Sequence, residues 1–141
     1  MKLSKFFTLE ELTVSQAAAR QGLSNVPDAA ILKTLTNTAK CLDEVRLLLG
    51  VPIVVNSGYR SPLVNKAVGG ASKSQHVEGK AVDFIAPKFG SPRQIVEKIL
   101  SSNIPFCQII LEFDSWVHIS FSSDNRKQAL VIDKQGTRIF S

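Results

Sequence analysis

The chain carries the sequence Ser74-Gln75-His76-Val77-Glu78-Gly79-Lys80-Ala81-Val82-Asp83, which leads directly into the apolar segment Phe84-Ile85-Ala86. Residues 81–85 alternate like a half-buried β-strand, so Asp83 shares a face with Ala81 and Ile85. A buried carboxylate is costly unless it has a cation, several hydrogen-bond donors or a raised pKa. A metal ion held by Asp83 and His76 would meet this cost, provided that a third ligand arrives from elsewhere. The chain has two histidines, and the other one is His118.

Further motifs lie on both sides of this segment. They are Val54-Val55-Asn56-Ser57-Gly58-Tyr59-Arg60-Ser61-Pro62, Asn65, Val68-Gly69-Gly70 and Trp116-Val117-His118. Together they resemble the zinc D-alanyl-D-alanine carboxypeptidase and L-alanyl-D-glutamate endopeptidase family. The S-x-H-x-x-G-x-A-x-D spacing is the specific part of this likeness. The N-terminal segments Phe7-Thr8-Leu9-Glu10-Glu11-Leu12, Ser15, Ala19-Arg20 and Asn25-Val26-Pro27 resemble the small single-domain branch of phage and prophage.

The resemblance extends from about residue 6 to about residue 122, and it implies both a fold and a reaction. The implied fold is α+β, with a small antiparallel sheet that carries a zinc site and helices packed on its other face, as in hedgehog and D-Ala-D-Ala peptidases. The implied ligands of one zinc ion are His76, Asp83 and His118. The implied reaction is hydrolysis of a peptide bond in the peptidoglycan stem peptide. A two-histidine, one-carboxylate set also suits iron, and the resemblance favours zinc.

Hydrolysis at such a site needs a carboxylate that takes a proton from water. Many relatives place this acid three residues before the final histidine, where this chain has Ser115. We expect Glu112 to be the base, because a three-residue hairpin loop at 113–115 would put it on the same face as His118. A two-residue loop would place Glu112 on the opposite face of the sheet from His118. Asp114 is the alternative base.

Four further residues are predicted to bind substrate. Arg60 follows a predicted strand, and by resemblance its guanidinium pairs with a substrate carboxylate or with the oxyanion at the attacked carbonyl. Ser74 precedes His76 by two residues and is expected either to bind substrate backbone or to orient Asp83. Tyr59 and Gln108 are assigned to the cleft by resemblance.

The length of 141 residues suits one domain. We expect a helical part at 1–50, a catalytic core at 51–122 and a peripheral hairpin at 123–141. The expected helices lie at 9–12, from Ser15 to Gly22, from Pro27-Asp28 to Gly50, after Pro62 and after Ser91-Pro92. The expected strands lie at 52–57, 81–86, 106–112, 116–121, 129–132 and 137–140.

The formal charge of +5 favours anionic partners such as wall polymers. The basic residues are scattered, without the dense runs or interleaved aromatics typical of nucleic-acid binding. No segment has the apolar length of a membrane span, and the N-terminus lacks a secretory signal. We therefore expect synthesis in the cytoplasm, and access to the wall through lysis-linked release or as a virion component. Cys41 and Cys107 are expected to be free thiols.

We expect a monomer, with association with a virion as the alternative. Two other functions are open at this stage. A zinc-containing module could bind the cell wall without hydrolysis, since the usual Glu-x-x-His spacing is missing. The chain could also be a structural part of a phage tail. Carboxypeptidase and endopeptidase action differ in pocket shape, which the sequence does not reveal.

Overall fold

The computed structural model describes residues 1–141, and its first part is helical. Three helices form there: α1 (Leu9–Leu12), α2 (Gln16–Gln21) and α3 (Ala29–Leu49). Each begins at a side chain that accepts a hydrogen bond from a free N–H group of the first turn: Thr8, Ser15 and Asp28. Thr8 and Glu11 form a capping box at the start of α1, where the sequence predicts a helix. Gly50 ends α3 as the sequence indicates.

A six-stranded sheet follows, with the strand order β1-β2-β4-β3-β5-β6. Its strands are β1 (Val54–Ser57), β2 (Ala81–Ile85), β3 (Gln108–Glu112), β4 (Trp116–Ser120), β5 (Gln128–Asp133) and β6 (Gly136–Ile139). Neighbours pair antiparallel except β3 and β5, which are parallel. The predicted hairpin after residue 123 is present, and its first strand joins the main sheet through this parallel pairing. The α+β class with a mostly antiparallel sheet is confirmed.

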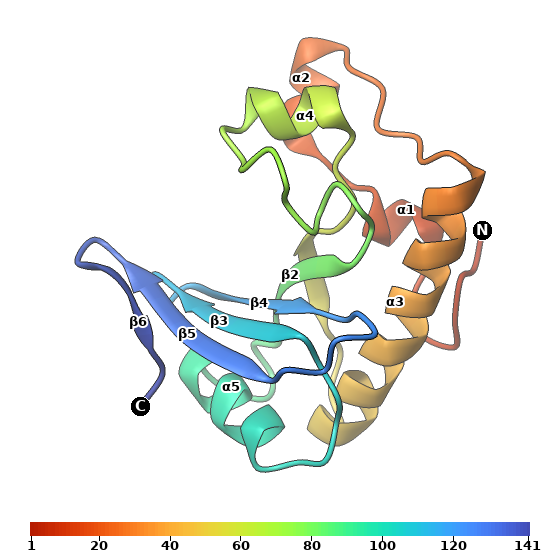
Figure 1. Ribbon diagram of the computed structural model, residues 1–141. Helices are drawn as coiled ribbons and strands as arrows, with labels where there is room; N and C mark the ends of the chain where they lie inside the picture. Colours follow the sequence, from red (N-terminus) through yellow and green to blue (C-terminus); the bar gives the residue numbers. More distant parts are fainter.

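Two further helices complete the fold: α4 (Pro62–Ala67) and α5 (Pro92–Leu100). Both begin with a serine cap followed by proline, which suits the first helical turn because proline has no N–H to satisfy. In Figure 1, α5 lies beneath the sheet and α3 runs along its side, whereas α2 and α4 lie on the opposite side. The predicted helical layer on one face of the sheet is therefore present.

The hydrophobic core fills the space between the sheet and the layer of α3 and α5. The strands direct alternate residues into it, among them Val82 and Phe84 of β2 and Val117 and Ile119 of β4. The same alternation sends Asp83 and His118 to the opposite face. None of the helices combines the length and hydrophobicity that crossing a membrane requires. Cys41 and Cys107 are both free thiols, as expected.

Candidate metal centre

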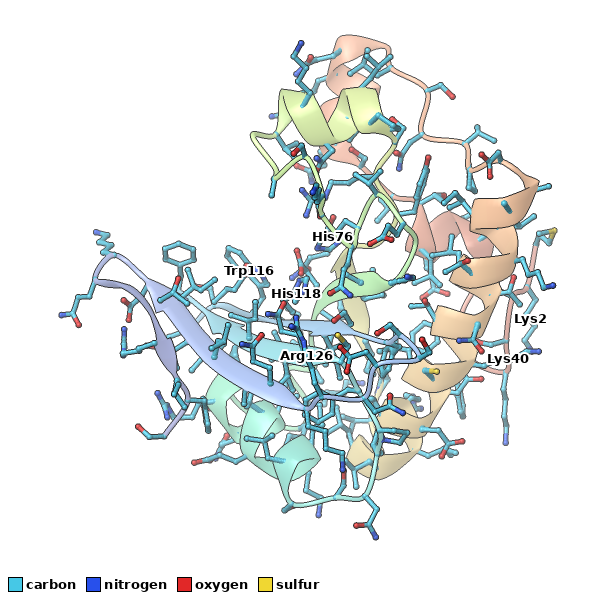
Figure 2. All side chains as sticks on the ribbon, in the orientation of Figure 1. Lys2, Lys40, His76, Trp116, His118 and Arg126 are labelled. Atoms are coloured by element: carbon cyan, nitrogen blue, oxygen red, sulfur yellow. The ribbon has the colours of Figure 1, made fainter.

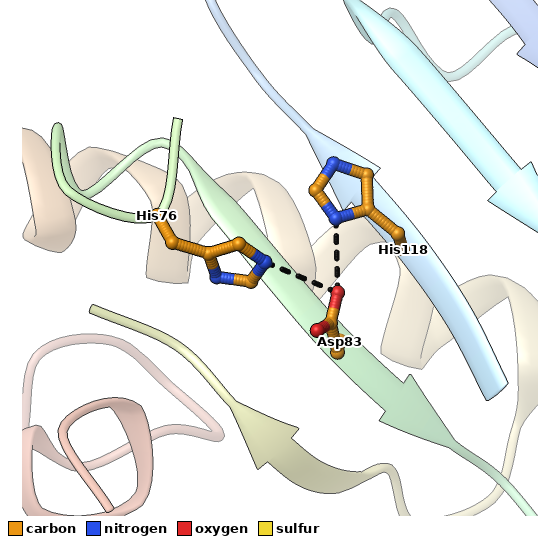
Figure 3. A group of neighbouring side chains, drawn as sticks. All are labelled: His76, Asp83 and His118. Atoms are coloured by element: carbon orange, nitrogen blue, oxygen red, sulfur yellow. Dashed lines mark hydrogen bonds and ion pairs between the residues drawn. The ribbon is translucent and has the colours of Figure 1, made fainter. Parts of the chain in front are cut away.

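Three side chains with metal-ligating groups meet on the sheet face that is turned away from the core. Asp83 of β2 and His118 of β4 are direct partners across the antiparallel pair. His76 comes from the turn before β2. The potential ligand atoms of the three residues all lie within 4.8 Å of one another. Figure 3 shows the Asp83 carboxylate facing both imidazole rings.

The distances within this cluster are those of hydrogen bonds. Asp83 Oδ1 lies 2.9 Å from His118 Nδ1 and 3.2 Å from His76 Nε2. His76 Nδ1 lies 2.8 Å from the carbonyl oxygen of Gly58, which can only accept. His76 Nδ1 therefore donates a hydrogen bond to this carbonyl, and His76 Nε2 is the ring atom that faces Asp83. A protein carbonyl that orients a histidine in this way is typical of metal ligands.

The loop around His76 is also held in place. Ser74 Oγ accepts a hydrogen bond from the His76 backbone N–H at 3.1 Å, and the His76 carbonyl accepts one from the Arg60 N–H at 3.1 Å. The His76 residue as a whole is 3% exposed. Two imidazoles and a carboxylate that are fixed before binding form a donor set suited to zinc, which takes three protein ligands and keeps a fourth position open in catalytic sites.

Electrostatics in the cluster favour the ionised form of Asp83, whose side chain is 13% exposed. Burial alone would raise the pKa of Asp83, but hydrogen bonds from His118 and His76 and the charges of these rings outweigh it. The net result is a pKa well below the usual range of an aspartate. The carboxylate is therefore a ready ligand for a cation.

Glu112 ends β3 opposite Trp116, so the hairpin loop has the three residues on which the sequence argument depended. The register places Glu112 on the face of His118. Burial, together with the negative charge of Asp83, raises the pKa of Glu112. The Trp116 indole N–H lies beside Glu112 but outside hydrogen-bond geometry. Asp114 lies in the exposed hairpin turn, away from the cluster.

A cleft of about 410 Å³ opens next to the cluster and contains Arg60, Asp83, Glu112 and Trp116. This volume lies within the range of small-molecule binding pockets. Figure 2 shows Trp116 and His118 on the sheet face that is turned toward α2 and α4. The Arg60 Nε and Trp116 Nε1 atoms are buried and have no hydrogen-bond partner within the protein. Both residues line the cleft, and the positive charge of Arg60 suits a ligand with carbonyl or carboxylate oxygens.

Arg60 is held at its backbone and at its side chain. Asn25 holds the two residues that flank Arg60. Its side-chain amide donates to the Tyr59 carbonyl at 3.0 Å and accepts from the Ser61 N–H at 2.7 Å. Arg60 Nη1 donates to Asn65 Oδ1 at 3.1 Å. Asn65, 4% exposed, is in turn fixed by a bond to the Ala71 carbonyl. Burial lowers the pKa of Arg60. The negative charges of Asp83 and Glu112 act in the opposite direction and offset part of this shift.

The other predicted substrate-binding residues lie further from the cluster. Tyr59 is 5% exposed and belongs to the hydrophobic core. Gln108 lies on the site face of β3 but donates to Gln128 at 2.7 Å, away from the cleft. Sequence reasoning assigned no role to Asn65, although it was part of the recognised pattern. It also missed that α2 borders the cleft, for which no local signal exists.

We expect the substitution Gly58→Ala to weaken metal binding. A Cβ at Gly58 would overlap the carbonyl oxygen of Leu12 and lie 2.9 Å from its carbon. The Tyr59 N–H donates to that same oxygen at 2.8 Å, so the two backbones cannot separate without breaking this bond. The Gly58 carbonyl would then move away from His76 Nδ1. The expected loss in zinc affinity is about ten- to hundredfold, measured by competition with a chromogenic chelator.

Gly136→Ala is the matched control for this change. Gly136 begins β6 directly after the hairpin turn and has a φ of 107°, so alanine strains the backbone there without contact to the cluster. We expect Gly136→Ala to lower the melting temperature and leave zinc affinity unchanged. Equal zinc affinity in Gly58→Ala and wild type would contradict the role of the Gly58 carbonyl.

Comparison with known families gives one match, and it covers most of the chain. The family model described as peptidase M15 matches residues 5–120. No protein of curated function matches the chain. The matched range includes His76, Asp83, His118, Glu112 and Arg60. Since the match extends from the first helix to the end of β4, the chain belongs to the peptidase M15 family.

Proposed function

We propose that this protein is a zinc metallopeptidase that hydrolyses peptide bonds in the stem peptide of peptidoglycan. The observation that carries the proposal is the preorganised cluster of His76, Asp83 and His118 at the edge of a cleft that also holds Glu112 and Arg60. Membership of the peptidase M15 family supports peptide hydrolysis. The formal charge of +5 supports approach to an anionic cell wall.

In this mechanism the three residues of the cluster hold the metal ion, and Glu112 moves the proton. A zinc ion held there would supply Lewis acidity, which would polarise a carbonyl group and make water a stronger acid. The Glu112 carboxylate accepts a proton from the attacking water and then donates it to the leaving amine. Its raised pKa suits both steps, because a base with a pKa closer to the working pH also returns the proton more readily.

Arg60 stabilises negative charge in the same reaction. Its guanidinium is permanently charged, and Arg60 lines the cleft beside Asp83 and Glu112. It either pairs with a substrate carboxylate next to the scissile bond or stabilises the oxyanion that forms at the attacked carbonyl. Because Asn65 and the backbone around Arg60 fix the guanidinium before substrate arrives, little reorganisation is needed during the reaction.

Asn65→Leu tests the positioning of Arg60. Leucine of similar size removes the acceptor for Arg60 Nη1 and leaves the Ala71 carbonyl without its donor. We expect kcat/KM to fall about ten- to hundredfold, in line with the cost of an unsatisfied buried group. Zinc content is expected to stay at the wild-type level, because Asn65 touches none of the three proposed ligands. A folded Asn65→Leu protein with wild-type kcat/KM would contradict the positioning role.

The proposal is tested by incubating zinc-loaded protein with purified peptidoglycan and measuring newly released amino groups. Mass spectrometry of the products then identifies the bond. Release of free D-alanine would indicate a D-Ala-D-Ala carboxypeptidase, and exposure of an N-terminal D-glutamate would indicate an L-Ala-D-Glu endopeptidase. Zinc-loaded protein that binds walls but releases no amino groups would replace this proposal with a non-catalytic wall-binding module.

We further propose that the protein acts on the cell wall in the context of phage or prophage, either after lysis-linked release or as part of a virion. The support is the resemblance of the N-terminal segments to that branch. Detection of the protein in purified particles would indicate the virion route, and its restriction to the lysate would indicate release at lysis.

A further inference from the structure

We propose that Arg20 forms a second anion-binding point in the cleft, which recognises a carboxylate of the substrate at a distance from the bond that is cut. This inference rests on the proposed function, because it concerns the same cleft. It adds a substrate class: an acidic peptide with at least two carboxylates, one beside the scissile bond and one further along.

The cleft is lined by two separate parts of the fold. One wall is formed by α2 and the residues before it, including Ser15, Ala17 and Arg20. The opposite part is formed by the sheet face with Asp83, Glu112 and Trp116. Figure 1 shows α2 and α4 together on this side of the sheet, and the two helices pack against each other. A peptide that reaches the metal cluster therefore lies alongside α2.

The cleft is lined by two acidic and two basic side chains. Asp83 and Glu112 are the acidic residues, and the proposed mechanism uses both of them at the reaction centre. Arg60 lies near these carboxylates, and their charges act on its pKa. Arg20 is exposed and takes part in none of the ion pairs of the protein. It is thus a cation in the cleft wall whose charge is available to a ligand.

The helix itself does not account for this arrangement. Arg20 lies in the last turn of α2, where a cation interacts favourably with the helix dipole. That interaction requires a positive charge near the helix end, but it does not require the side chain to point toward the cleft. In the structure Arg20 lines the same cleft as Arg60. Two arginines in one cleft, on different elements, favour a ligand with two separated carboxylates, because each guanidinium can form a charge-assisted hydrogen bond.

The test is a chemical double-mutant cycle with two synthetic peptides. Such a pair of peptides is made for each candidate bond, L-Ala-D-Glu and D-Ala-D-Ala, and the two peptides of a pair differ only in whether the carboxylate remote from that bond is free or amidated. Binding of each peptide to zinc-loaded protein is measured by calorimetry in a Glu112→Gln background, and cleavage is measured with the wild-type Glu112 present. The substitutions compared are Arg20→Gln and, as a matched loss of one positive charge elsewhere, Arg93→Gln. Arg93 contacts Phe140 and the carbonyl of Ser141, away from the cleft.

We expect Arg20→Gln to weaken binding of the free diacid about three- to tenfold and to raise its KM similarly, with kcat unchanged. Arg20→Gln is expected to have a negligible effect on binding and KM of the amidated peptide. Arg93→Gln is expected to leave binding and KM unchanged for both peptides. Equal effects of Arg20→Gln on both peptides, no effect on either, or failure of the diacid to bind would overturn the proposal. Arg20-dependent binding without cleavage would instead leave this inference standing while the proposed hydrolysis failed.

Discussion

Replacement of Glu112 by glutamine is expected to lower kcat by about 10² to 10⁴, the usual contribution of a positioned acid–base group. Glutamine keeps the size of the side chain and its place at the end of β3, but it cannot accept the proton of the attacking water. Because Glu112 is not one of the three proposed ligands, bound zinc should remain at the wild-type amount. The measurement is kcat on a defined stem peptide, together with the zinc content of each preparation.

Asp114→Asn is the matched control for this substitution, since it removes a carboxylate from the same hairpin. Asp114 lies in the exposed turn and outside the cleft of the cluster. We expect the Asp114→Asn protein to keep full activity. Loss of activity in Asp114→Asn with full activity in Glu112→Gln would reverse the assignment of the base.

His118→Ala is expected to abolish both metal binding and hydrolysis. The substitution removes one of three protein donors and the hydrogen bond of 2.9 Å that orients Asp83. Two remaining ligands do not make the three-ligand set that catalytic zinc sites use. The measurement is zinc per chain after dialysis against metal-free buffer, followed by amino-group release from peptidoglycan.

Ser120→Ala is the control on the same strand. Ser120 is fully buried, shares the face of β4 with His118 and has an Oγ without a partner in the protein. The variant therefore tests whether a small change at this depth disturbs the sheet by itself. We expect it to retain one zinc per chain, whereas a similar zinc loss in both variants would argue for unfolding instead of ligand removal.

The sequence predicted most of the elements because their signals are local. Helices begin beside Ser15, Asp28 and Ser91, and α3 ends at Gly50, as the sequence predicts. Asp83 was informative because it does not fit the local pattern of its strand. A carboxylate in an apolar strand conflicts with its surroundings, and such conflicts are expected at functional sites.

The features that the sequence did not reveal are those set by tertiary contacts. The parallel pairing of β5 with β3 depends on how the segment after Phe121 crosses the sheet, for which no residue pattern exists. The position of Tyr59 in the core, instead of the cleft, follows from the close packing of this segment on α1. The approach of α2 to the cleft likewise joins segments that are distant in the chain. Glu112 was an intermediate case, because its direction depended on the length of one loop.

The central claim is that one zinc ion, held by His76, Asp83 and His118, is required for hydrolysis of peptidoglycan. The most direct test is to strip the protein with a chelator, remove the chelator and titrate zinc back while amino-group release is recorded. The account predicts no release from the stripped protein and a linear rise that ends at about one zinc per chain. Full activity of the stripped protein, or one bound zinc per chain without any release, would contradict it.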